Sequence, residues 1–161
     1  MTTIAPMRAE AYAVFLEDAI AVYAAENIGG GRWRAEEAQG LARAETERLL
    51  SHGIQTPDHY IFEVLDTPEG QSVGYVWFAT LPRGMVKVAF VFQLRIKAEF
   101  QRQGHARAAL SLVEQRAREL ALSGMALHVF AHNSGACALY RSVGYNVSSL
   151  NMIKPFLASD A

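Results

Sequence analysis

The sequence has few of the features that mark secreted, membrane-bound or nucleic-acid-binding proteins. Its single cysteine, Cys137, can form neither an intramolecular disulfide nor a cysteine-rich zinc site. Fifteen basic residues are balanced by sixteen acidic ones, and a net charge of −1 gives no basic excess for nucleic acid or anionic lipid. No apolar run approaches the roughly 20 residues that cross a bilayer, and the first ten residues lack the order of a signal peptide. We therefore expect a cytoplasmic protein with no nucleic-acid or membrane partner.

What the sequence does contain is enough apolar material for a core. Hydrophobic residues make up 51% of the 161 residues, which suits one compact domain, residues 1–161. Apolar residues recur at helical spacing from Tyr12 to Tyr23 and from Ala35 to about His52, and three consecutive glycines separate the two stretches. We expect a helical region over residues 9–53 and a sheet-containing core over residues 59–154.

The pattern then becomes typical of β-strands, with short turns that contain Pro and Gly. After a short first strand at Thr3–Met7, the expected strands are His59–Asp66, Val73–Thr80, Met85–Ile96 and Met125–Ala131, with one or two closing strands between Tyr145 and Lys154. The turns at Thr67–Gly70 and Leu81–Gly84 are short, which favours antiparallel pairs.

Helical spacing returns from Ala106 to about Ser123 and over Ser134–Ser142. A helix between the strands Met85–Ile96 and Met125–Ala131 requires a crossover, so these two strands should be parallel. We predict an α/β fold with about four helices and a mixed sheet of six or seven strands. The strands should be mostly antiparallel, with one parallel pair.

The segment Phe100–Ala106 joins the longest expected strand to the helix that follows. The first turn of a helix has unpaired N–H groups and the positive end of the helix dipole, so it can bind a phosphate. Gly104 would allow close approach, and Arg102 and Arg107 would add positive charge. A glycine in this place also serves often as a simple break between elements. The fingerprints of dinucleotide-binding and nucleotide-hydrolase loops are both incomplete here.

Two motifs resemble a known family. Gln101, Gly104 and Ala106 match, in order, the central motif of the GNAT superfamily of acyl-CoA-dependent N-acetyltransferases: Arg or Gln, two residues, Gly, one residue, Gly or Ala. The block His132–Tyr145 is similar to the family's later motif, with Asn, Ala, Leu-Tyr and Gly-aromatic at the expected intervals. The resemblance extends over about Tyr60–Lys154, and the first two helices are similar to the family's variable lid.

The resemblance implies acetyl-CoA as the cofactor and a GNAT-like fold with the parallel strand pair at the cofactor site. The loop amides would hold the pyrophosphate, and the backbone of Leu94 and Ile96 would pair with the pantetheine arm. The residues that we assign to cofactor binding are Leu94, Arg95, Ile96, Gln101, Arg102, Gln103, Gly104, His105, Ala106, Arg107, Asn133 and Ala136. Asn133 would contact the cofactor or only cap a helix, and His105 would donate to phosphate or lie exposed.

Catalysis by the family implies an acid for the departing thiolate and a base for the amine. Tyr140 matches the family's tyrosine near the CoA sulfur and is the expected acid, with simple packing as the alternative. Many members have an acidic residue in the long strand where this chain has Gln93, so the base is unassigned. Glu26, Glu63, His128 or water could serve.

The predicted function is transfer of an acetyl group to a primary amine, on a small molecule or a peptide, by direct attack in a ternary complex. Residues that we expect to border the acceptor are Tyr23, Glu26, Trp33, Trp77 and Gln93, although the tryptophans are also typical core residues. The alternatives are a non-catalytic acyl-CoA sensor or partner subunit, and an interaction protein that uses the helices Glu10–His52. No residue points to a metal. Dimers are common in the family, so a homodimer paired through C-terminal edge strands is also expected.

Overall fold

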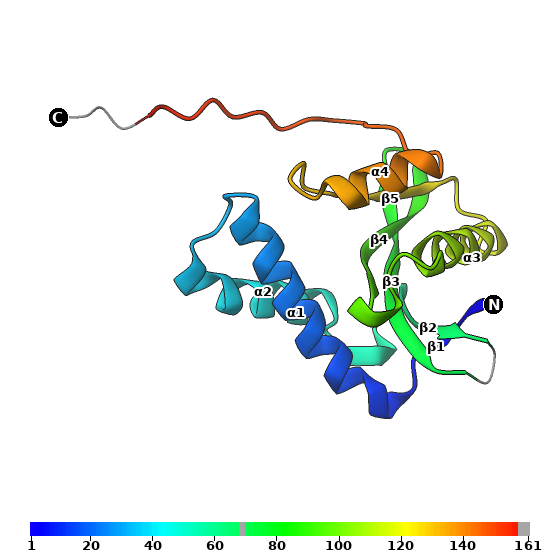
Figure 1. Ribbon diagram of the computed structural model, residues 1–161. Coiled ribbons are helices and arrows are strands. Elements are labelled where there is room, and N and C mark those ends of the chain that lie inside the picture. The colour runs from blue at the N-terminus through cyan, green and yellow to red at the C-terminus, as the bar shows by residue number, and fades with distance from the viewer. Residues whose placement is uncertain (68–69, 158–161) are drawn as a thin grey trace.

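A computed structural model of the protein describes residues 1–67 and 70–157 (Figure 1). The helices and strands are β1 (Thr2–Pro6), α1 (Tyr12–Gly29), α2 (Ala35–Leu49), β2 (His59–Asp66), β3 (Ser72–Arg83), β4 (Val86–Ile96), α3 (His105–Glu119), β5 (Met125–Leu127) and α4 (Ser134–Ser142). This order confirms the predicted succession from β1 to α4. The predicted turn at Thr67–Gly70 contains Pro68 and Glu69, which lie outside the described residues.

The five strands form one mixed sheet in the order β1-β2-β3-β4-β5. The first four are antiparallel neighbours, and β5 pairs with β4 in parallel, as the α3 crossover requires. The prediction of one parallel pair in an otherwise antiparallel sheet is therefore confirmed. Within the described residues, no helix has the length and apolar character needed to cross a membrane.

The strand count is slightly below the predicted six or seven, because the closing strands expected between Tyr145 and Lys154 do not form. Residues 145–157 belong to no helix or strand, and the segment extends away from the body of the protein (Figure 1). A strand needs a neighbour for its backbone groups, and this segment has none within the described part of its own chain. Likewise, β5 ends at Leu127 rather than Ala131, because the chain leaves β4 there.

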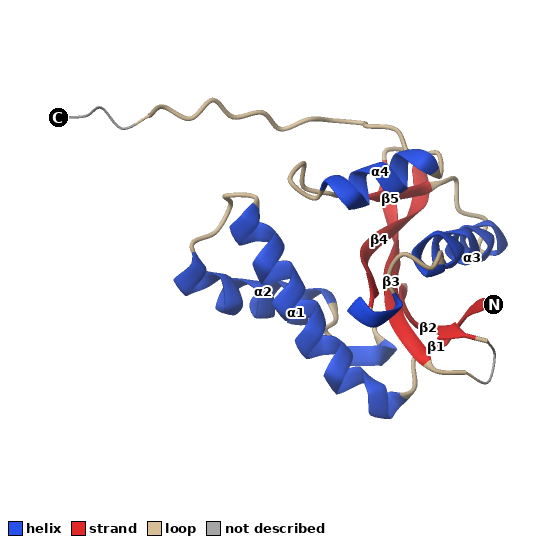
Figure 2. Cartoon of the chain, in the orientation of Figure 1, coloured by secondary structure: helices blue, strands red, loops and turns tan. Residues whose placement is uncertain are grey.

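Helices cover the two faces of the sheet (Figure 2). On one face α3 places Ala109 and Val113 against Phe78 and Val91 in the main core. On the other face α1 packs Phe15 against Trp77. Small residues of α1 and α2 let these two helices approach each other closely, and the buried members of this contact are Ile20, Ala24, Ala38 and Ala42.

A bulge in β4 decides which side chains reach each face. Phe78 pairs with Val91 and Trp77 with Gln93, so Phe92 is an extra residue opposite no partner. Side chains normally alternate between faces with a period of two. Here Val91 packs on the α3 side, and after the bulge so does Leu94. Gln93 consequently points to α1, where its Nε2 donates to the carbonyl of Ala19 at 2.8 Å.

Candidate active site

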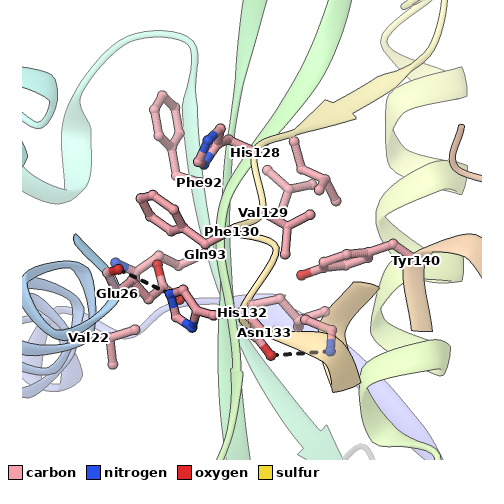
Figure 3. A pocket seen from close by; sticks show the side chains of 14 residues that line it. Val22, Glu26, Phe92, Gln93, His128, Val129, Phe130, His132, Asn133 and Tyr140 are labelled. Atoms are coloured by element: carbon pink, nitrogen blue, oxygen red, sulfur yellow. Dashed lines mark hydrogen bonds between the residues drawn. The ribbon is translucent and has the colours of Figure 1, made fainter. Parts of the chain in front are cut away.

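A pocket opens where β4 and β5 separate. Val91 and Leu127 are the last paired residues, and beyond them the strands diverge. The pocket between them is closed by α1 on one side and α4 on the other (Figure 3). Side chains at its wall include Glu26, Gln93, His128, Phe130, Asn133, Ala136 and Tyr140. Residues of α1, β4, the end of β5 with the loop after it, and α4 therefore meet at one hollow.

Two glycines at the end of α1 allow this convergence. A Cβ on Gly30 would lie 2.5 Å from the ring of Phe130, and one on Gly29 would lie 3.0 Å from the ring of His132. Nε2 of His132 also donates to the carbonyl of Glu26 at 3.3 Å (Figure 3). The run of glycines, which the sequence suggested only as a helix break, therefore also gives the pocket wall room to touch α1.

A second hollow lies at the N-terminus of α3, where the sequence predicted a phosphate site. It is lined by Ile96, Phe100, Gln101, Arg102, Gly104, His105, Ala106, Arg107 and Leu139. Gly104 has a φ of +88°, and a Cβ there would meet open space. Within the described part of the chain, the N–H groups of residues 104–107 donate to no protein acceptor. Four donors thus converge at the positive end of the α3 dipole.

The side chain of His105 does not project into this hollow. It is buried, and its Nδ1 lies 2.9 Å from Oγ1 of Thr2 in β1. Its Nε2 is also buried and has no partner among the described residues. The expectation that this side chain donates to phosphate or lies exposed is therefore wrong, and only its backbone N–H is placed for an anion.

The other loop side chains differ in what they contact. Gln101 donates from Nε2 to the carbonyl of Ile96 at 2.9 Å and so holds the loop against the end of β4. Arg107 donates to Oγ of Ser142 at 2.8 Å, which ties α3 to α4. Gln103 turns back to the carbonyl of Glu99, outside the lining of the hollow.

The two strand positions predicted to pair with a pantetheine arm lie at a free edge. The N–H of Ala89 donates toward β5, to the carbonyl of Gly124. Past the bulge, the carbonyl of Ile96 accepts from Gln101 rather than from β3, so Ile96 faces away from β3. By alternation Leu94 faces the same way, along the stretch of β4 that β5 no longer covers. The side chain of Arg95 points toward α1, where its Nε lies 3.2 Å from Oδ2 of Asp18.

The later motif forms α4, with its N-terminus at the pocket. Oδ1 of Asn133 accepts from the N–H of Ala136 at 3.3 Å, so Asn133 caps the helix and also lines the pocket. The hydroxyl of Tyr140 points into the pocket (Figure 3). Burial, and secondarily the charge of Glu26, raises the pKa of Tyr140 above its ordinary value. The phenol therefore stays protonated at neutral pH.

The three residues suggested as a base lie in different environments. Glu63 is held by Arg8, whose Nε lies 2.9 Å from its carboxylate, and this contact lowers the pKa of Glu63. His128 is exposed at the pocket wall. Glu26 lies in the pocket opposite Tyr140, and burial raises the pKa of its carboxyl group, against the opposing effects of His132 and Arg95. Only Glu26 combines a place in the pocket with a carboxylate.

Of the five residues expected to border the acceptor, two reach the pocket, Glu26 and Gln93. Tyr23 and Trp33 make an edge-to-face contact at 5.3 Å and pack against the core between α1 and α2. Trp77 is buried, stacks on Phe92 at 4.6 Å, and donates to Nδ1 of His59. These three aromatic residues do not line the pocket.

A polar network beside the pocket had no signal in the sequence. The hydroxyl of Tyr75 lies 2.7 Å from Oδ2 of Asp18 and 2.9 Å from Oε1 of Gln93. Because Nε2 of Gln93 is engaged by Ala19, both ends of the Gln93 amide are in use. Burial, followed by the contact with Asp18, raises the pKa of Tyr75. Over residues 1–67 and 70–157, no cluster of metal-ligating side chains occurs.

Known proteins resemble this chain over almost its whole length. The acetyltransferase (GNAT) family matches residues 18–145. The Bacillus subtilis (strain 168) protein named uncharacterized N-acetyltransferase YdgE is 31% identical over 152 residues, 94% of this chain and 96% of that protein. The crystal structure of the putative acetyltransferase YycN from Bacillus subtilis superposes with a TM-score of 0.91 at 29% identity and covers 98% of this chain and 100% of that one. A putative acetyl transferase from Pyrococcus furiosus, at 22% identity, shares the fold with a TM-score of 0.71. The chain belongs to the acetyltransferase (GNAT) family.

Proposed function

We propose that this acyltransferase moves an acetyl group from acetyl-CoA to a primary amine by direct attack in a ternary complex, in the cytoplasm. The observation that carries the proposal is the set of four N–H groups at residues 104–107 that have no acceptor among the described residues, beside the edge of β4 that β5 does not cover. The two hollows adjoin each other along α4, since Leu139 lines one and Tyr140 the other. An extended ligand with an anionic end fits this arrangement.

The residues present suit acetyl-CoA. Its pyrophosphate would accept from the N–H groups of residues 104–107, with charge from Arg102 and Arg107. Its pantetheine arm would pair with the backbone of Leu94 and Ile96. When bound, acetyl-CoA supplies the activated acyl thioester. We propose that α1 and α2 act as a lid over the acceptor.

Tyr140 is the proposed general acid. A neutral phenol can give its proton to a departing thiolate, and the raised pKa of Tyr140 keeps that proton in place at neutral pH. Its hydroxyl enters from the α4 wall of the pocket, which is the side adjoining the proposed cofactor groove (Figure 3).

Glu26 is the proposed general base. Its carboxylate stands at the α1 wall of the pocket, opposite Tyr140, where it could both attract a cationic amine and accept its proton (Figure 3). The raised pKa of Glu26 brings its basicity closer to neutral pH. An acceptor amine bound between Glu26 and Tyr140 would have its base on one side and the acid for the leaving group on the other.

A non-catalytic acyl-CoA sensor is the second candidate. It is supported by Gln93, which stands where many members of the family have an acidic residue and whose amide is engaged at both ends. Such a protein would bind acetyl-CoA through the same loop without turnover.

An acetylation assay over a panel of small amines and peptide N-termini, followed by release of free thiol, tests the transferase. Calorimetry with acetyl-CoA accompanies it. Thiol release that depends on an amine supports transfer, whereas heat of binding without thiol release with any amine favours the sensor. Absence of both would remove the loop as a cofactor site.

A further inference from the structure

The acceptor side of the pocket has an aromatic wall. Phe92 of β4 and Phe130, from the segment after β5, both line the pocket. Figure 3 shows both rings on the side of β4 where Glu26 lies. Tyr140 enters from the other side (Figure 3). Val22 of α1 adds an aliphatic side chain to the lining. Apolar groups from three segments of the chain therefore border the space in front of the carboxylate.

Packing from behind holds the two phenylalanine rings in place. Phe92 stacks on the buried Trp77, with 4.6 Å between the ring centroids and an interplanar angle of 22°. Phe130 lies against Gly30 of α1, where a Cβ would come within 2.5 Å of its ring. Rings that are already fixed lose little conformational entropy when a ligand packs on them. The wall is thus preorganised for a flat group.

The bulge in β4 explains why Phe92 belongs to this wall. In a regular strand, successive side chains face opposite sides of the sheet. Gln93 points to α1, where it donates to Ala19, so a regular neighbour would face α3. As the extra residue, Phe92 instead packs with the cluster that contains Trp77, on the α1 side. An aromatic ring and an amide from consecutive positions therefore share the acceptor side.

The polar groups of the pocket are few, and most are already engaged. The Gln93 amide is used at both ends. Nε2 of His132 contacts the carbonyl of Glu26, and Oδ1 of Asn133 caps α4. Among the described residues that line the pocket, Glu26 is the single carboxylate, and no lysine or arginine is present. The lining thus offers one negative charge to a cation and no full positive charge to an anion.

This inventory disfavours several classes of acceptor. An amino acid would bring a carboxylate, which the described lining has no lysine or arginine to offset. A polyamine would bring several cations, of which Glu26 can balance one. An amino sugar would also bring hydroxyl groups that need hydrogen-bond partners. A single ammonium group on an apolar skeleton leaves none of these groups unpaired.

We infer that the acceptor is a small primary monoamine with a flat apolar skeleton, such as an aryl-substituted alkylamine. The inference rests on the proposed acetyl transfer, whose acceptor it specifies. The aryl ring packs on Phe92 and Phe130, and aromatic pairs add stability beyond the area that they bury. The nitrogen loses its proton to Glu26 as the amide bond forms and the C–S bond breaks, and Tyr140 protonates the sulfur. The two phenylalanines determine specificity and take no part in the chemistry.

Steady-state acetylation by the wild-type protein tests the acceptor class. We expect kcat/KM for 2-phenylethylamine to exceed that for 2-cyclohexylethylamine, which has the same carbon count without the flat ring, by about threefold to tenfold. It should exceed the values for phenylalanine and spermidine by about 10²-fold or more. Equal values for the two analogues would overturn the inference and leave acetyl transfer intact. So would an equal or greater value for phenylalanine, spermidine or a peptide N-terminus.

Calorimetry tests the aromatic wall without relying on turnover. With coenzyme A present, 2-phenylethylamine should bind the wild-type protein. Phe92→Leu and Phe130→Leu should each weaken this binding by about threefold to tenfold. Phe90→Leu is the matched control, because its ring lies 4.9 Å from that of Phe92 but does not line the pocket. Its affinity for the amine should equal that of the wild type, and circular dichroism checks the fold of all three variants.

The two assays separate the acceptor class from the transferase activity. No binding of 2-phenylethylamine, or binding that is unchanged in both pocket variants, would overturn the inference about the acceptor. Binding that depends on both rings, without thiol release from any amine, would support the aromatic site and remove the transferase instead.

Discussion

Oγ1 of Thr2 and Nδ1 of His105 lie 2.9 Å apart, so the first strand is joined to the first residue of α3 across 103 positions of sequence. The neighbouring Thr3 has a buried hydroxyl with no partner in the described residues. These adjacent threonines provide a matched pair, because both have the same shape and only one makes a hydrogen bond.

Thr2→Val should lower the free energy of unfolding by about 1–2 kcal/mol, because it leaves Nδ1 of His105 buried and unpaired. Thr3→Val should leave the free energy of unfolding unchanged or raise it slightly, because it removes a buried hydroxyl that has no partner. Urea denaturation of both variants checks this difference. Equal losses would mean that the Thr2–His105 contact contributes nothing.

Tyr140→Phe should lower kcat by about 10²-fold or more, because it removes the proposed proton donor while keeping the ring. The affinity for acetyl-CoA, measured by calorimetry, should not change. Tyr145→Phe is the control: its ring lies 5.6 Å from that of Tyr140, and its buried hydroxyl has no described partner. Equal kcat values for the two variants would remove Tyr140 from the chemistry.

Glu26→Gln should abolish the acid limb of the pH–rate profile and lower kcat by about 10²-fold. The active form of a general base is deprotonated, so wild-type kcat should rise with pH through the pKa of Glu26. Burial places this midpoint above the ordinary glutamate value of about 4.3. His128→Asn, measured with the same acceptor, should keep the limb. If instead the limb persists in Glu26→Gln and disappears in His128→Asn, the base is His128.

Gly104→Ala should weaken acetyl-CoA binding by about tenfold or more, equivalent to about 1.4 kcal/mol, because its methyl group enters the proposed phosphate groove. The left-handed φ of +88° should also cost about 1 kcal/mol in folding stability. Gly40→Ala is the control, in the exposed middle of α2 with open space for a Cβ. It should raise stability by about 0.5–1 kcal/mol and leave binding unchanged.

Local pattern predicted the regular elements well. The spans His59–Asp66 and Ser134–Ser142 agree residue for residue with β2 and α4, because Gly and Pro turns or a capping Asn133 bound them in the sequence itself. The phosphate loop was predictable for the same reason, since a strand, a glycine and a helix occur in succession.

Contacts between distant segments could not be predicted. Nothing local to His105 indicates that β1 buries it, and nothing near Glu26 indicates that α1 brings it opposite Tyr140. Trp77 was suggested for the acceptor site because its aromatic character fits a site and a core equally well. Strand propensity between Tyr145 and Lys154 was visible in the sequence, but propensity does not say where a pairing partner lies.

The extra residue in β4 divides that strand into two sections, and residues of one parity face opposite sides of the sheet in the two sections. Before Phe92, odd-numbered residues such as Val91 face α3, and after it even-numbered ones such as Leu94 do. The bulge absorbs Phe92, so Gln93 and Leu94 keep the faces that they would have if they followed Val91 directly. Deleting Phe92 would therefore leave Gln93 toward α1 and Leu94 toward α3, and it would remove the ring that stacks on Trp77 at 4.6 Å. The bulge is consequently the one place between Val91 and Leu94 where β4 can lose a residue and keep the register of both its halves against β3.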